Sequence, residues 1–545
     1  MLIQPKVLDR NRLLSQLKTT DFDLLVIGGG ITGCGIALDA ATRGLKVALL
    51  EKSDFASGTS SKSTKLIHGG LRYLKQMEFG LVREVGSERA IVHKLAPHLV
   101  LPEKMLLPLV KGGSYGKFMT ALGLGIYDLL AGVVKEDRRK MLSAKATAAL
   151  EPLLRTDILE GGGYYAEYRT DDARLTTEIM KTAIAHEAVC LNYVQVDGFL
   201  QSDGKITGVN ATDVIGSQSF KVTAKVVVNA AGPWVDDLRE LDGSKTGKHL
   251  FHSKGVHIVV PYQRLPLHAA VYFDTPDGRM VFAIPRQGIT YIGTTDTAYQ
   301  GSLNEVSATV EDVEYLLKAA NHMFPTVHLR MEDVQSSWAG LRPLIFEPGK
   351  KASEMSRKDE IFESGSGLIS IAGGKLTGYR KMAARIVDRV IKRLDWKTRS
   401  ICKTDKIPLT GGPFADAKAV EQYKKSLVEK GLSTASAAYL THNYGKQSDW
   451  IVARAGSDKS ESELARAELA YCLEYEGVQT ALDYFNRRSG RLYFQIESVK
   501  KLLPLLMPDL AAFLHWDQNK IQQEEQTVYD AIRQVSVFQP DYQNL

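Results

Sequence analysis

Three glycines between a strand-like run and a helix-forming stretch constrain the fold of this chain most. A short apolar run precedes Gly28-x-Gly30-x-x-Gly33, and a small-residue helix and a second apolar run ending at Glu51 follow it. Glycines there permit a tight turn, close approach of the backbone to a pyrophosphate, and close packing of helix on strand. The order predicts a parallel β-α-β unit that binds a dinucleotide, with Glu51 accepting hydrogen bonds from a ribose hydroxyl. The alternative is a glycine-rich turn without a ligand.

The segment 57–70, SGTSSKSTKLIHGG, is too polar and too rich in glycine to be a core element. It follows the pyrophosphate end of the predicted site, so it is interpreted as a loop of hydroxyl and amide donors around an anionic, flat cofactor. Apolar residues within and after the segment argue against the alternative, a solvated linker. The glycine pattern by itself does not distinguish FAD from NAD.

The stretch SSKSTKLIHGGLRYL, following the glycine pattern, resembles the FAD-dependent, respiratory (aerobic) glycerol-3-phosphate dehydrogenases, which are related to the D-amino-acid-oxidase-like flavoenzymes. Later stretches extend the resemblance in order through most of residues 23–380: DDARL at 171–175, VVVNAAGPWVD at 226–236, KGVHIVVP at 254–261, IGTTDT at 292–297, GLRPL at 340–344 and AGGKLTGYR at 372–380.

The pattern and the resemblance together predict an α/β FAD-binding Rossmann-like domain, an antiparallel-sheet substrate domain (α+β) and a helical C-terminal domain. The expected bounds are 20–90, 190–250 and 350–398 for a discontinuous FAD-binding domain, 91–189 and 251–349 for the substrate-binding domain, and 410–545 for the helical domain. The turn PLTGGP at 408–413 marks the last boundary.

FAD is the expected cofactor, and no histidine or cysteine motif argues for covalent attachment. Two glycines, a lysine and a threonine open a predicted helix at 373–377, which suits negative charge developing on the flavin; a helix cap without a ligand is the alternative. The resemblance implies the following cofactor-binding residues: Gly28, Gly30, Gly33, Glu51, Thr59, Ser60, Ser61, Lys65, Leu66, His68, Gly69, Val194, Ala230, Gly232, Trp234, Gly374, Lys375, Leu376 and Thr377.

Oxidising an alcohol beside a flavin requires a base for the hydroxyl proton and cations for the anionic end of the substrate. His257 is the preferred base, because an unperturbed histidine titrates near neutral pH; a buried core histidine is the alternative. Which of His257, His68 and Lys375 takes the proton stays open. The expected catalytic residues are His257, Arg342 and Lys375, and the expected substrate-binding residues are Arg72, His68, Tyr73, Arg342, Lys375 and Thr377.

The resemblance implies oxidation of sn-glycerol 3-phosphate to dihydroxyacetone phosphate, with electrons passing from reduced FAD to a membrane quinone. Glycerol-3-phosphate oxidases, which use O2 and make H2O2, have most of the same motifs. An extra insertion of that branch is not seen here, which favours the dehydrogenase. Two further classes stay open at this point: an amine or amino-acid flavin oxidase, and a non-catalytic flavin-bound scaffold.

The net charge is +6 and the isoelectric point about 8.8, which suits an acidic substrate or an anionic membrane surface and is too small to indicate nucleic acid. Four widely separated cysteines exclude the common metal spacings and suggest a reducing compartment. The most apolar stretch, 118–134, is interrupted by Asp128. A cytoplasmic protein, peripheral on the cytoplasmic face of the membrane, is therefore expected, and a homodimer is allowed. Arg487-Arg488 is interpreted as a solvated helix end, although acidic neighbours or lipid phosphates could also receive it.

Overall fold

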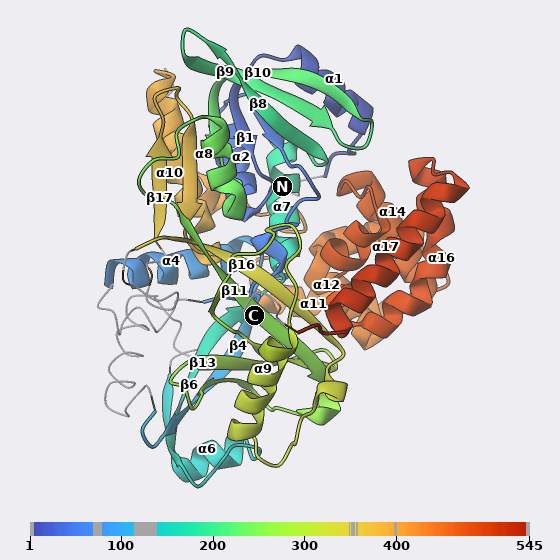
Figure 1. Ribbon diagram of the computed structural model, residues 1–545. Helices are drawn as coiled ribbons and strands as arrows, with labels where there is room; N and C mark the ends of the chain where they lie inside the picture. Colours follow the sequence, from blue (N-terminus) through green and yellow to red (C-terminus); the bar gives the residue numbers. More distant parts are fainter. Residues whose placement is uncertain are drawn as a thin grey trace.

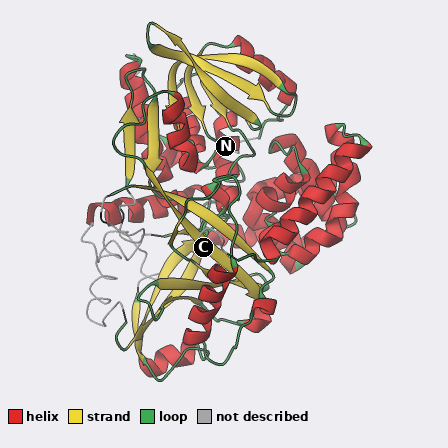
Figure 2. Cartoon of the chain, in the orientation of Figure 1, coloured by secondary structure: helices red, strands yellow, loops and turns green. Residues whose placement is uncertain are grey.

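Two β-sheets and a group of C-terminal helices make up the described chain. The computed structural model describes residues 5–68, 79–113, 139–347, 349, 355, 358–396 and 400–540. The first sheet lies at the top of the view, the second extends from the middle of the molecule to the bottom, and the C-terminal helices pack together to one side (Figure 1). Strands and helices are segregated in the same way when the chain is coloured by secondary structure (Figure 2).

The first sheet has a parallel centre. Its main path runs β17 (Asp359–Glu363), β18 (Ile369–Gly373), β10 (Gln218–Asn229), β1 (Phe22–Ile27), β2 (Val47–Leu50) and β7 (Val189–Leu191). In register, Ile27 at the end of β1 lies beside Leu50 of β2 and Asn229 of β10. The residues that directly follow these strands therefore meet at one edge of the sheet, where ligands bind in open α/β folds.

Helices and an antiparallel extension cover the first sheet. The helices are α2 (Ile31–Thr42), α7 (Asp172–Ala185), α10 (Tyr379–Arg393), α8 (Val235–Leu241) and α1 (Arg10–Thr19), and the extension is formed by β8 (Val194–Ser202) and β9 (Lys205–Asp213). The whole of β1 is buried, as expected for a central parallel strand. A methyl group on Gly33 of α2 would lie 1.9 Å from the Gly28 carbonyl oxygen, so glycine lets this helix pack directly on the strand.

The second sheet is mainly antiparallel. Its path runs β15 (Thr297–Ala298), β11 (Leu250–Pro261), β14 (Ile289–Gly293), β13 (Met280–Arg286), β12 (Ala270–Asp274), β4 (Leu101–Val110), β6 (Leu159–Arg169) and β3 (Leu66–Ile67), with β16 (Ser336–Ile345) also on β11 and β5 (Lys140–Ser143) on β6. Side chains of β11 alternate: Val256 and Ile258 pack into the core beneath α9 (Val310–Met323), and His257 points to the opposite face.

The expected fold class is confirmed by these two sheets and the C-terminal helices. The sequence of 141–151 predicts one short helix before Pro152, and this is wrong for its first residues, which pair with β6 as part of β5. The helix that follows is α6 (Ala144–Leu150). The mixed charge and apolar spacing of 78–94 predict a helix, which is confirmed from residue 79 on as α4 (Phe79–Leu95). Residue 78 and the stretch 118–134 lie outside the described residues. Among the helices that the structure describes, none combines the length and the apolar character needed to span a bilayer. The domain bounds given above stay a prediction.

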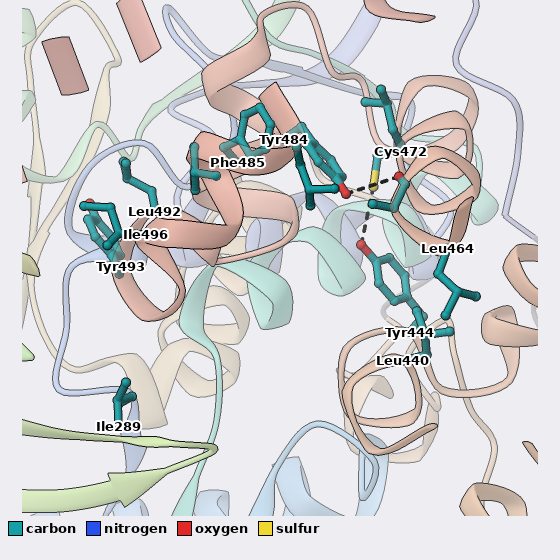
Figure 3. Close-up of a cluster of buried hydrophobic side chains, with 14 of the residues drawn as sticks. Ile289, Leu440, Tyr444, Leu464, Cys472, Tyr484, Phe485, Leu492, Tyr493 and Ile496 are labelled. Atoms are coloured by element: carbon teal, nitrogen blue, oxygen red, sulfur yellow. Dashed lines mark hydrogen bonds between the residues drawn. The ribbon is translucent and has the colours of Figure 1, made fainter. Parts of the chain in front are cut away.

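The C-terminal helices are α11 (Ala417–Glu429), α12 (Thr434–Tyr444), α13 (Ser448–Arg454), α14 (Glu461–Tyr475), α15 (Arg491–Phe494), α16 (Ile496–Leu514) and α17 (Gln518–Ser536). Figure 3 shows part of their core, where the Tyr444 hydroxyl lies 3.4 Å from the Cys472 sulfur. The amphipathic pattern of 464–486 predicts a single helix, and this prediction is wrong. Helix α14 ends at Tyr475, the chain turns at Gly477 with a φ of +68°, and a π-helical turn follows.

The interpretation of Arg487-Arg488 as a solvated helix end is also wrong, because both side chains are buried against acidic neighbours. Arg488 donates two hydrogen bonds to the Asp54 carboxylate, at 2.7 and 2.8 Å, and two to the Glu476 carbonyl, at 2.7 and 3.2 Å. Arg487 also donates to Asp54, and Arg174 of α7 pairs with the Glu476 carboxylate. We call this set of five residues the seam: Asp54, Arg174, Glu476, Arg487 and Arg488.

A buried histidine near the seam predicts that the protein loses stability in mild acid. Neither ring nitrogen of His98 has a partner among the described residues, and burial lowers the pKa of His98 to about 3. The unfolded chain takes up this proton near pH 6.5 and the folded chain does not, so stability is lost as pH falls below 6.5. We expect about 2 kcal/mol less unfolding free energy at pH 5 than at pH 6.5 from this group.

Urea unfolding of the wild-type protein and of His98→Phe at the two pH values measures this difference. The variant should show a smaller loss of unfolding free energy between pH 6.5 and 5. An equal loss in both proteins would contradict the assignment to His98.

Candidate active site

A cavity of about 520 Å³ lies where the carboxyl edge of the first sheet meets the second sheet. Its walls come from the β1–α2 turn, the segment 57–68, the end of β10, and strands β11 and β16. The turn at 373–377, between β18 and α10, closes another side. The volume lies in the range typical of small-molecule and cofactor sites.

One end of the cavity is built to hold an anion. The N-terminus of α2 opens there, and its first residue is preceded by Gly30, which adds no capping side chain. Gly28 has a φ of +112°, and a methyl group on it would lie 2.6 Å from the Ala230 carbonyl oxygen. Ser60 accepts a hydrogen bond from the Ile31 N–H at 3.0 Å, so the segment after the second strand is fastened to the helix start.

Glu51 stands at the end of β2, on the wall of the cavity. Its carboxylate accepts hydrogen bonds from the backbone N–H groups of Gly29 at 2.6 Å and Ser53 at 2.8 Å, and burial raises its pKa. A carboxylate has about four lone-pair sites, so acceptor capacity remains for ribose hydroxyls. Nearby, the indole nitrogen of Trp234 is buried without a partner among the described residues, and the Lys52 ammonium lies 4.1 Å from the centre of the indole ring system. These features fit a dinucleotide.

Arg342 of β16 lies across the backbone of β11. Its guanidinium donates to the Thr294 hydroxyl at 2.8 Å and to the Thr295 carbonyl at 3.2 Å, and it lies 3.4 Å from Asp296. A methyl group on Gly255 would lie 2.3 Å from the guanidinium, so this glycine makes the space that the arginine occupies. The guanidinium is thus held in place while the residue lines the cavity.

His257 of β11 is 1% exposed and stacks on the Trp338 indole, with ring centres 4.8 Å apart and planes at 10°. Its Nε2 lies 3.0 Å from the Thr64 hydroxyl, and its Nδ1 is buried without a partner among the described residues. Burial, and next the charge of Arg342, lower the pKa of His257 well below its usual range. The imidazole is therefore neutral at physiological pH and can accept a proton.

The turn at 373–377 precedes α10. Gly373 and Gly374 have φ values of +76° and +83°, conformations that favour glycine. The Thr377 hydroxyl donates to the His68 carbonyl at 3.4 Å, which joins this turn to the end of the segment 57–68. Lys375 lines the cavity at the same place.

The structure brings most of the predicted site residues to this one cavity. Those that line it are Gly28, Gly30, Glu51, Thr59, Ser60, Leu66, His68, Val194, Ala230, Gly232, Trp234, His257, Arg342, Gly374, Lys375, Leu376 and Thr377. Gly69, Arg72 and Tyr73 lie outside the described residues. Gly33, Ser61 and Lys65 do not line the cavity.

Lys65 lies behind the cavity wall instead of facing it. Its ammonium binds the Asp172 carboxylate at 2.5 Å and the Ser61 carbonyl at 3.1 Å, and the side chain is 2% exposed. A buried carboxylate needs a cation close by, and Lys65 supplies it. Lys65, expected among the cofactor-binding residues, thus has its ammonium in an ion pair with Asp172, and its binding of a cofactor stays a prediction.

Sequence reasoning missed several lining residues. Lys62 and Thr64 belong to the segment 57–70, which was interpreted as a donor loop, so their polar side chains were the available signal. Lys52 directly follows Glu51 at the end of a predicted strand, and this position could have predicted that it lies at the edge of the cavity. Gly255 and Gly340 gave no signal, because only the packed structure shows what lies against them.

Comparisons with known proteins agree with this arrangement. A family model described as FAD dependent oxidoreductase matches residues 23–380, and one described as the C-terminal domain of alpha-glycerophosphate oxidase matches residues 402–521. The aerobic glycerol-3-phosphate dehydrogenase of Bacillus subtilis (strain 168) is 52% identical over 524 residues, covering 94% of each chain. That of Staphylococcus haemolyticus (strain JCSC1435) is 49% identical over 534 residues, covering 95% of each chain.

A solved structure is similar over nearly the whole length. It is the X-ray structure of the glycerol-3-phosphate dehydrogenase from Bacillus halodurans complexed with FAD, 44% identical, with a TM-score of 0.83. The match covers 98% of the present chain and 99% of that chain.

Proposed function

Because the chain belongs to the FAD-dependent oxidoreductases, and within them to the family of the aerobic glycerol-3-phosphate dehydrogenases, we propose that it oxidises sn-glycerol 3-phosphate to dihydroxyacetone phosphate. One observation carries the proposal: a single cavity joins an anion-binding helix start to a neutral buried histidine and an anchored arginine. The first part suits a dinucleotide, and the other two suit a phosphorylated alcohol.

The chain's own residues fit FAD. The N-terminus of α2, the turn at Gly28 and the carboxylate of Glu51 would hold its pyrophosphate and a ribose. The unpartnered Trp234 indole nitrogen is a donor that a bound ligand would satisfy. FAD, when bound, supplies the acceptor for the hydride that leaves the substrate carbon.

In this proposal the substrate is oriented by its charge. The guanidinium of Arg342 holds the anionic end, since a planar fork of donors matches phosphate oxygens. Arg72, outside the described residues, is proposed as the second cation. Lys375, at the turn before α10, lies beside both the substrate oxygen and the cofactor. His257, neutral and able to accept a proton, is the preferred base, with His68 and Lys375 as the other proposed acceptors.

A membrane quinone is the proposed electron acceptor, which the relatives' description as aerobic dehydrogenases supports. The net charge of +6 suits a peripheral contact with an anionic membrane surface. Oxygen is the competing acceptor, as in the glycerol-3-phosphate oxidases. The homodimer remains a prediction.

Anaerobic mixing tests the proposal. Purified flavin-loaded protein is mixed with sn-glycerol 3-phosphate, and the flavin absorbance is followed before a short-chain quinone or air is added. Bleaching reversed quickly by quinone and slowly by air is the expected result. No bleaching would overturn the substrate assignment, and fast reversal by air with H2O2 formed would make the protein an oxidase.

Substituting Gly255 tests how Arg342 is positioned. A methyl group 2.3 Å from the guanidinium forces the arginine to move, and a misplacement of about 1 Å can cost about 100-fold in rate. We therefore expect Gly255→Ala to lower kcat/KM for sn-glycerol 3-phosphate by about 100-fold, mainly through a higher KM. Steady-state kinetics with a quinone acceptor measures it.

Gly365→Ala is the matched control, because no atom of the described residues lies within 4 Å of the added methyl group. Its kcat/KM should equal that of the wild-type protein. A Gly255→Ala protein with unchanged kinetics would contradict the role of Arg342 in binding the substrate.

A further inference from the structure

We propose that the Thr64 hydroxyl is the group that takes the substrate's hydroxyl proton and passes its own proton to His257. The proposal rests on the function proposed above and deepens it. It assigns a relay residue to the base that the site already contains.

His257 lines the cavity, but neither of its ring nitrogens is open to a substrate. Nδ1 is buried, and no described residue partners it. Nε2 is engaged at 3.0 Å by the Thr64 hydroxyl. The ring itself is covered by the Trp338 indole on one face and is 1% exposed. A proton that reaches His257 from the cavity therefore passes through the group bound to Nε2.

Thr64 is placed to be that group. It lines the cavity and is half-buried, whereas His257, which also lines the cavity, is 1% exposed. A threonine hydroxyl has one donor and two acceptor sites, so it can accept one proton while giving another. No other described side chain forms a hydrogen bond with His257.

The backbone around Thr64 is fixed by the same residues that surround His257. The Trp338 indole N–H donates to the Ser63 carbonyl at 3.0 Å, and the Tyr291 hydroxyl donates to the Thr64 carbonyl at 3.1 Å. The Ser63 N–H in turn donates to the Asp172 carboxylate at 3.0 Å. A relay needs its heavy atoms held within hydrogen-bond distance, and these three bonds hold the segment there.

Atoms and electrons balance in this step. The O–H bond of the substrate's secondary alcohol breaks, and its proton binds Thr64 Oγ as the original Thr64 proton moves to Nε2 of His257. The C–H bond of the same carbon breaks, its electron pair leaves as the hydride that FAD accepts, and a C=O bond forms. The step requires the resting proton of His257 on Nδ1, with the Nε2 lone pair facing Thr64.

The charged groups facing His257 keep it ready to accept a proton. Arg342 and Lys65 both lower its pKa, after the larger effect of burial, and the Tyr291 ring packs nearby with centres 6.4 Å apart. The neutral ring therefore persists over the physiological range.

Two substitutions separate a relay from a structural role. Thr64→Val is nearly isosteric and removes the hydroxyl, and Thr64→Ser keeps it. We expect anaerobic flavin reduction by sn-glycerol 3-phosphate to slow by about 100- to 1,000-fold in Thr64→Val and to stay near wild type in Thr64→Ser. The rate of flavin reduction is also measured at increasing fractions of D2O. In the wild type and in Thr64→Ser, its dependence on that fraction should show that two protons move in the same step.

Equal rates in Thr64→Val and wild type, or a single proton in flight in wild type, would overturn the relay. Failure of the wild-type protein to bleach would instead overturn the proposed function. The relay is then still decided by nitrogen NMR of histidine-labelled, FAD-loaded protein, with the His257 signals assigned by their loss in His257→Asn. An unprotonated Nε2 supports the relay, and a protonated Nε2 overturns it.

Discussion

Asp54→Ala is expected to lower the free energy of unfolding by about 3–5 kcal/mol, which is the usual cost of leaving buried charges without their partner. The Asp54 carboxylate is 1% exposed and accepts hydrogen bonds from Arg487, Arg488 and the Asn192 side-chain amide. Its removal leaves two buried guanidinium groups facing a cavity in place of an acceptor. The midpoint of urea unfolding of the FAD-loaded protein, at constant slope, measures the loss.

Asp388→Ala is the control for this substitution. Asp388 also pairs with an arginine, Arg43, but its side chain is 66% exposed, and exposed pairs contribute at most about 1 kcal/mol. A loss in Asp54→Ala no larger than in Asp388→Ala would show that the seam does not hold the helical region to the first sheet.

The Asp54 pKa adds a pH window to the same prediction. The charges of Arg488 and Arg487, opposing burial, lower the pKa of Asp54 to about 2. The unfolded carboxylate takes up its proton near pH 4, so the stability that Asp54 contributes is present above pH 4 and is lost as pH falls toward 2. Asp54→Ala should lack this part of the acid dependence.

Gly33→Ala is expected to weaken FAD binding by roughly 10- to 100-fold, corresponding to an overpacking cost of about 1–3 kcal/mol. The added methyl group would lie 1.9 Å from the Gly28 carbonyl oxygen, and both are fixed to backbone. Helix α2 must therefore move away from β1, which carries its N-terminus out of position for the pyrophosphate. Flavin fluorescence titration of the apo-protein measures the change in affinity.

Gly80→Ala is the matched control, since Gly80 is also in a helix, α4, and the part of the chain that the structure describes has no atom within 4 Å of an added methyl group. Its FAD affinity should match that of the wild-type protein. Wild-type affinity in Gly33→Ala would mean that the α2 start does not hold the pyrophosphate.

The β-α-β unit was predictable because its signals are local. Buried strands, a small-residue helix and a strand-end acid follow one another in the sequence, and each has one structural explanation. The two faces of β11 were also predictable, because successive side chains of a strand point to opposite faces of the sheet. Val256 and Ile258 therefore face the core, and His257 faces the other side.

Side-chain partners across the chain were not predictable in the same way. The direction of Lys65 depends on Asp172, and the burial of Arg488 depends on Asp54, hundreds of residues earlier in the chain. Two adjacent arginines in a sequence are most often exposed to solvent. Here the end of α14 and the turn at Gly477 place both side chains in the interior. The Thr64–His257 contact likewise joins positions 193 apart in sequence.

The seam also bears on how the protein is made in the cell. Asp54 lies three residues after Glu51, which lines the cavity, yet the arginines that pair with it stand 433 and 434 positions later in the chain. During translation, the β-α-β unit and Asp54 are therefore made well before the two arginines that pair with the Asp54 carboxylate. The buried charges of the seam are therefore paired only after the C-terminal helices up to α14 have been made.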